Sequence, residues 1–310
     1  MNLFIIGNGF DLTHGLKTSY EDFRVYLQTK YPEADADEFV MPEVYTKPNG
    51  GEAVDDVVVV SFLLRIISMT EGDKWKDVET TLGLLDFSEY FDGVDYDRDS
   101  DGDIDLWKQV YINEGTALNL ILPTVKITEY FSDWIKTINV NERILVKNDF
   151  AKLIDPNEDL FLTFNYTETL ELVYRARNVC HIHGKQGEEI LFGHGNDKDY
   201  YEDYMISYIG AENALDEIYR SLRKDTEGAL KRHIDFFNKI DSKIDKVYSF
   251  GFSFSAVDAI YIQEICNRLG NQNIVWYLND YDNEVKREEY KKTIRKCGYK
   301  GLFDTYSINK

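Results

Sequence analysis

Apolar residues recur along the chain with two different spacings, and these spacings indicate its elements. The run Leu3–Ile6 is apolar throughout and ends at Gly7, which predicts a short buried first strand. From Ser19 onward, apolar residues lie three or four positions apart, as in a helix, and this spacing recurs from about residue 57 to residue 150. Residues 32–56 hold three of the five prolines and predict an irregular connection.

The second half of the chain alternates between short apolar runs and helical spacing. Strands are expected over 160–164, 179–182, 246–250 and 273–278, with a short extended piece at 190–192, and helices over 168–176, 212–239, 257–268 and 283–295. Strands separated by helices predict an α/β, Rossmann-like, mainly parallel sheet covered on both faces. We expect residues 1–18 and 155–310 to form this domain, with residues 19–154 as a large, mostly helical insertion after the first strand.

Composition and charge narrow the class of protein. The chain has 310 residues, of which 43% are hydrophobic, and so it can bury a substantial core. A net charge of −21 makes nucleic-acid binding a poor expectation. The three cysteines show no CxxC pairing, which predicts a protein of the reducing cytoplasm. The longest apolar run, 57–69, is shorter than the ~20 residues of a membrane span, so no membrane segment is expected.

Polar and glycine residues follow the predicted strands, where ligands bind in parallel sheets. These are Gly7, Asn8, Gly9, Phe10 and Asp11 after the first strand, Asn165 after the second, His183 after the third, and Gly251 to Ser255 after a later one. The glycines would let the backbone approach a pyrophosphate, but the third glycine of the GxGxxG pattern is missing, so a tight turn without a ligand is an equal alternative. Asp11 could bind a ribose hydroxyl or cap a backbone group.

Amide and imidazole side chains supply candidate chemistry. Asn165 can both donate to and accept from a hydroxyl or a water, although it or Thr167 could simply cap the next helix. His181, His183 and His194, with His14 near the glycine turn, are candidates for a general base, for a metal site or for structural roles. No metal-binding spacing supports the metal alternative, so no obligatory metal is predicted.

The acidic segment 92–105 matches part of a calcium-binding loop. Counting from Asp97, oxygen ligands fall at positions one, three and five, and Gly102 stands at position six. Calcium-binding loops need a bidentate Glu at position twelve, and this chain has Lys108 there. A solvated acidic loop is therefore expected, with adventitious calcium binding as the alternative.

The opening residues 3–23 resemble the signature of the AbiH family, which is associated with bacteriophage abortive infection. The resemblance continues in Trp75–Glu79, Thr163–Glu171, His181–Gly184 and Ser249–Asp258. AbiH proteins in turn are remotely similar to sirtuin-like NAD-binding domains. By that similarity Asn165 and His183 would be catalytic, and the nucleotide would be bound by Gly7, Asn8, Gly9, Phe10, Asp11, His14, Gly251, Ser253 and Asp258.

The resemblance implies a bacterial anti-phage protein that binds NAD or a related nucleotide and hydrolyses its N-glycosidic bond. A phage-derived trigger and a homo-oligomer are further expectations. Two departures matter: Thr167 stands where sirtuins have an acid, and the chain lacks their paired CxxC zinc motifs. The alternatives are a nucleotide-binding sensor without catalysis, and a metal-dependent hydrolase or nuclease built on His181, His183 and His194.

Overall fold

The computed structural model of the chain describes residues 1–72, 74–92, 98, 105–141, 144–241, 243–270 and 274–308. The chain divides into two compact units. The sheet unit consists of Met1–Ser19, Trp134–Leu191 and Asp225–Lys310, and the helical unit of Tyr20–Asp133 and Phe192–Lys224. The helical unit thus includes residues 192–224, which lie beyond the expected range 19–154. Most of the acidic segment 92–105, with its calcium-loop pattern, lies outside the described residues.

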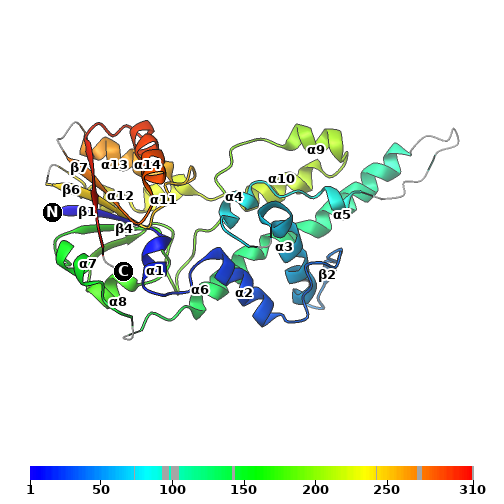
Figure 1. Cartoon of the computed structure of the whole chain (residues 1–310). Coiled ribbons are helices and arrows are strands. Elements are labelled where there is room, and N and C mark those ends of the chain that lie inside the picture. The colour runs from blue at the N-terminus through cyan, green and yellow to red at the C-terminus, as the bar shows by residue number, and fades with distance from the viewer. Residues whose placement is uncertain are drawn as a thin grey trace. The chain divides into compact units, whose positions relative to one another are not determined.

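Six parallel strands form the core of the sheet unit (Figure 1). They are β1 (Asn2–Ile6), β4 (Leu160–Thr163), β5 (Asn178–His181), β6 (Lys246–Phe250), β7 (Val275–Asn279) and β8 (Leu302–Tyr306). Their order in the sheet is β5-β4-β1-β6-β7-β8, so the direction of winding reverses between β1 and β6. This order is that of dinucleotide-binding folds, and the expected Rossmann-like class is confirmed.

Helices cover both faces of this sheet, because successive strand side chains point to opposite faces. On one face, α1 (Asn8–Thr13), α7 (Asn148–Leu153) and α8 (Thr169–Tyr174) pack on an aromatic cluster that includes Phe4 and Phe161. On the other, α11 (Thr226–Arg232), α12 (Ile234–Phe237), α13 (Ala259–Leu269) and α14 (Glu284–Lys296) cover a cluster that includes Leu162 and Trp276 (Figure 1).

Two elements of the second half differ from the expectation. The edge strand β8 was not expected, because its exposed positions leave only a weak apolar pattern. The helix expected over 212–239 is broken after α10 (Glu212–Ser221), since the Asp225 side chain accepts from the Gly228 N–H and starts α11 as its N-cap.

The helical unit confirms the mostly helical character expected for much of residues 57–150. It contains α2 (Tyr20–Lys30), α3 (Asp56–Glu71), α4 (Val78–Leu82), a 3₁₀ turn (Ser88–Tyr90), α5 (Leu106–Val125), α9 (Tyr201–Ser207), α10 and the short hairpin β2 (Tyr45–Thr46) and β3 (Glu52–Ala53). The boundary between the units falls within α6 (Ile127–Thr137). In the parts of the chain that the structure describes, no helix is long and apolar enough to cross a membrane.

Net charge is distributed very unequally between the two units. The sequence places 13 Lys and Arg against 33 Asp and Glu in the helical unit, but 22 against 23 in the sheet unit. The helical unit therefore carries a net charge of −20 and the sheet unit −1. The field that repels polyanions arises mainly from the helical unit, and the total charge does not oppose a nucleotide at the sheet.

Candidate functional site

The glycine bend after β1 packs directly on the loop after β6. The N–H of Gly7 donates to Phe250 O at 3.0 Å, and the N–H of Gly9 donates to Gly251 O at 2.9 Å. A Cβ at Gly9 would lie 2.6 Å from the Cα of Gly251, and Gly251 itself has a φ of +65°. The glycines thus allow two backbones to touch where the strand order reverses. The N–H groups of Gly7 and Gly9, which were expected to face a pyrophosphate, donate to backbone carbonyls inside the protein.

A cavity of about 340 Å³ adjoins this contact at the carboxyl ends of β1, β6 and β7. Gly9 and Gly251 form part of its wall, and its polar lining includes Thr13, Lys147, Asn279 and Asp282. Its volume falls within the range of ligand pockets. Asn279 ends β7 and Asp282 follows shortly after, so their positions at a strand end could have identified them from sequence. Lys147 precedes a helix, and no such signal marks it.

Asp11 lies buried beside the end of β4. Only 1% of its surface is exposed, and the Thr167 hydroxyl donates to its Oδ2. Burial raises the pKa of Asp11 to about 6, an increase partly offset by the hydrogen bond from Thr167 and by the nearby Thr169 hydroxyl and Asn165 amide. The other carboxylate oxygen, Oδ1, has no hydrogen-bond partner among the residues that the structure describes.

Asn165 is buried next to this carboxylate. Its side-chain amide is close enough to lower the pKa of Asp11, yet within the described part of the chain neither its oxygen nor its nitrogen has a hydrogen-bond partner of good geometry. Each buried polar atom left without a partner costs about 1–3 kcal/mol. Asp11 and Asn165 together present three such atoms at the carboxyl end of β1 and β4. The arrangement suits a polar ligand or a bound water.

His181 ties the Asn165 backbone to α8. Its Nδ1 lies 2.9 Å from Asn165 O and its Nε2 lies 2.8 Å from Glu171 Oε1. Both nitrogens face oxygen acceptors, so the ring is held between the Asn165 backbone and the Glu171 carboxylate. Neither nitrogen is left to coordinate a metal ion. His181 and Glu171 also line a second, polar cavity of about 380 Å³ beside the edge strand β5.

His183 forms a separate pair with Asp258. Its Nε2 lies 3.3 Å from Asp258 Oδ1, and the Ser255 hydroxyl donates to Asp258 Oδ2 at 2.8 Å. The imidazole and the carboxylate are both buried. A carboxylate in this position orients an imidazole and stabilises its protonated form, as in acid–base catalysis. Asp258, expected to contact the nucleotide, thus faces His183.

The loop that follows β6 and carries Asp258 has an unusual backbone. Phe254 has a φ of +55°, in the left-handed region that bulky residues rarely adopt. Its ring is buried against Phe252 and Tyr290, and this packing holds the conformation in place. Such outliers gather at functional sites. Ser253, expected to bind the nucleotide, is exposed on this loop.

The other two candidate histidines make their hydrogen bonds inside the protein. His14 Nδ1 donates to Phe10 O at 2.7 Å, and its Nε2 accepts from the Tyr174 hydroxyl at 2.6 Å. His194, in the helical unit, donates from Nε2 to Tyr219 O at 2.9 Å and accepts at Nδ1 from the Asn196 N–H. Burial lowers the pKa of both rings, which favours their neutral forms.

The metal alternative finds no support in this geometry. Among the described residues, no three His, Cys, Asp or Glu side chains are grouped so that they could hold a metal ion. The histidines named for such a site also have different partners, since His181 contacts Glu171, His183 pairs with Asp258, and His194 donates to Tyr219 O.

The candidate residues of the sheet unit therefore form three groups at one edge of the sheet. The first group is the glycine contact, which borders the cavity of about 340 Å³. The second is Asp11 and Asn165, near α1 and the start of α8. The third is His183 and Asp258, near the start of α13. Neither Asn165 nor His183 lines that cavity. Sequence reasoning missed Thr167 as the partner of Asp11 and Asp258 as the partner of His183, because these contacts join distant segments.

Comparison with known proteins gives one match. A family model described as "Bacteriophage abortive infection AbiH" matches residues 3–280, from β1 to the end of β7. No curated protein matches the chain, and no solved structure does.

Proposed function

This protein belongs to the AbiH family of bacteriophage abortive infection proteins, and we propose that it acts there by binding NAD or a related nucleotide and hydrolysing its N-glycosidic bond. The observation that supports the proposal is the set of buried polar atoms on Asp11 and Asn165 that find no hydrogen-bond partner in the described ranges of the chain. They lie at the carboxyl edge of a sheet whose strand order is that of dinucleotide-binding folds.

The proposed binding mode assigns the nucleotide to the carboxyl edge between β1 and β6. Lys147 supplies a cation for the phosphates, and Asn279 and Asp282 offer acceptors for ribose hydroxyls. Asp11 and Asn165 would bind the second ribose or a water. The net charge of −1 in the sheet unit is compatible with an anionic ligand.

In the proposed reaction, a water oxygen bonds to the anomeric carbon of the ribose and the bond to the nicotinamide nitrogen breaks. The bonding electron pair leaves with nicotinamide, and the proton of the attacking water passes to His183. Asp258 stabilises the imidazolium that forms. An ionised Asp11 would stabilise the positive charge that develops on the ribose in the oxocarbenium-like transition state. Asn165 would orient the water or a ribose hydroxyl.

Release of nicotinamide by the purified protein tests this proposal. We expect Asn165→Ala and His183→Ala to lower the rate by roughly 10²–10⁴-fold, the usual contribution of a positioned acid–base group. Asn178→Ala and His233→Ala are matched controls, because both side chains belong to the sheet unit and lie outside the proposed site. Equal nicotinamide release by all five proteins, with folding verified by circular dichroism, would refute the assigned roles.

A nucleotide sensor without catalysis is the second candidate. Thr167 stands where sirtuin-like enzymes have an acid, and its buried hydroxyl is committed to Asp11. Calorimetry with NAD and with ADP-ribose separates the two functions. Binding that requires Asn165, without nicotinamide release, would support the sensor, whereas turnover would exclude it. Activation by a phage-derived trigger, self-association and a cytoplasmic location stay predictions of the family resemblance.

A further inference from the structure

The helical unit combines strong negative charge with a small aromatic pocket. It contains 13 Lys and Arg and 33 Asp and Glu, so nearly the whole net charge of the chain lies in this unit. The pocket has a volume of about 170 Å³ and lies between residues 82–87 and the helices α9 and α10. No catalytic role assigned above involves it.

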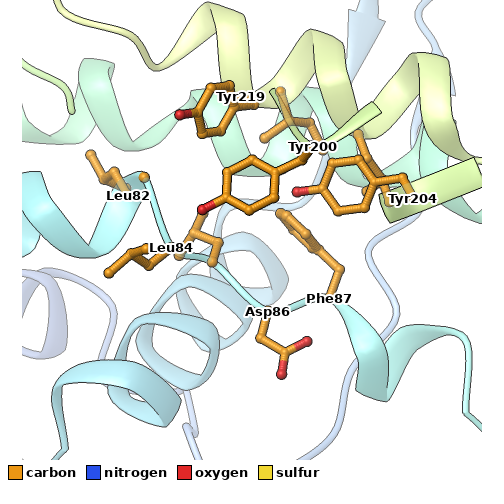
Figure 2. A pocket seen from close by; sticks show the side chains of 11 residues that line it. Leu82, Leu84, Asp86, Phe87, Tyr200, Tyr204 and Tyr219 are labelled. Atoms are coloured by element: carbon orange, nitrogen blue, oxygen red, sulfur yellow. The ribbon is translucent and has the colours of Figure 1, made fainter. Parts of the chain in front are cut away.

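Aromatic rings supply much of the pocket wall. Figure 2 shows the rings of Tyr200, Tyr204, Tyr219 and Phe87 gathered at the pocket, with Leu82 and Leu84 at its other side. The ring centroids of Tyr200 and Tyr204 are 5.8 Å apart, and the Tyr219 ring stands at 71° to that of Tyr200. The Asp86 carboxylate lies at the margin and points away from the rings (Figure 2). Ring faces in this arrangement offer negative electrostatic potential without a charged group inside the pocket.

One lysine of the protein itself already lies over one of these rings. The Lys198 Nζ lies 4.3 Å from the centroid of the Tyr200 ring and 2.8 Å from Asp203 Oδ2. The pocket also lies in a negative field. Burial raises the pKa of Tyr204, and the carboxylates of Asp216 and Asp203 raise it further. The Tyr204 phenol is therefore neutral at physiological pH, and the field around it favours positive ligands.

We propose that the helical unit docks a protein partner with a lysine-rich surface and that the pocket receives the ammonium group of one partner lysine. Charge complementarity selects this occupant, because a net charge of −20 attracts cations and repels phosphorylated or acidic ligands. The small volume and the aromatic wall suit an alkylammonium group. The inference is independent of the proposed nucleotide chemistry.

Binding of peptides to the full chain tests the proposal. The probe is a fluorescent peptide of alternating lysine and glycine, compared by anisotropy with the same peptide carrying acetyl-lysine. We expect the lysine peptide to bind at least tenfold more tightly, since acetylation removes the charge, and its binding to weaken with salt. Equal binding of the acetylated peptide would overturn the proposal.

Variants separate the pocket from the general charge of the surface. Tyr204→Leu should weaken binding of the lysine peptide about tenfold, whereas Tyr204→Phe should retain it because the ring face is preserved. Tyr111→Leu is the matched control, since Tyr111 is 78% exposed on α5 of the same unit. If Tyr204→Leu and Tyr111→Leu weaken binding equally, only diffuse charge attracts the peptide and the pocket has no part in it. Tyr204→Phe serves as the folding control, because its ring keeps the packing of the Tyr204 ring.

Discussion

Replacement of Asp11 by Asn should stabilise the protein at neutral pH. Burial raises the pKa of this carboxyl from 3.8 to about 6, and it is only 1% exposed, so solvent screens the effect little. Because the folded pKa lies above the unfolded one, the native state binds more protons than the unfolded state between these values. The contribution of Asp11 to stability is complete below about pH 4 and is lost as the pH rises through 6.

The size of this effect follows from the two pKa values. At about 1.4 kcal/mol for each tenfold change in proton affinity, the difference between 3.8 and about 6 corresponds to about 3 kcal/mol. Asp11→Asn removes the titration and keeps an oxygen that can accept from the Thr167 hydroxyl. We therefore expect the variant to be more stable than the wild type by up to about 3 kcal/mol at pH 7–8. The gain should shrink toward zero near pH 4.

Hydrogen exchange of the β1 and β4 amides measures this stability within the sheet unit, so unfolding of the helical unit does not obscure it. The exchange rates, corrected for the intrinsic effect of pH, are compared between wild type and variant from pH 4 to pH 8. Asp304→Asn, which removes an exposed carboxylate from the same unit, serves as the control. NMR titration of the Asp11 carboxyl in the wild type measures its pKa directly. A titration midpoint near pH 4 would refute the reasoning. So would a stability gain of Asp11→Asn over the wild type that is no larger at pH 8 than at pH 4.

Two further predictions concern packing, and thermal or denaturant unfolding measures both. Gly9→Ala should destabilise the sheet unit, because its Cβ would lie 2.6 Å from the Gly251 backbone. Gly115→Ala, on an open face of α5, should instead stabilise the helical unit by about 1 kcal/mol. A Gly9→Ala variant as stable as the wild type would contradict the backbone contact. Lys224→Met should lower the free energy of unfolding by about 3–5 kcal/mol, because it leaves Glu79 without its buried ion-pair partner at 2.6 Å. Adding Glu79→Leu should recover much of that loss. A double variant as unstable as the single one would argue against the pair.

Much of the sheet unit could be predicted because its signals are local. Leu3–Ile6, Leu160–Thr163 and Lys246–Phe250 are short runs bounded by turn or polar residues, and each forms a strand within a residue of its expected limits. The same reasoning placed Asn165 and His183 after strand ends. It failed where the local pattern is weak, as in β8, and where a capping residue such as Asp225 divides a continuous helical spacing.

The sequence by itself determined the α/β class, the family and the strand-end positions of the candidate residues, since periodicity and motifs are properties of neighbouring positions. Only the tertiary structure decided the partners of those residues. Thr167 reaches Asp11 across 156 positions of sequence, and Asp258 comes to His183 from another strand–helix unit. Partners, burial and the resulting pKa values depend on which segments pack together, and that choice is made by the whole core and not by any local pattern.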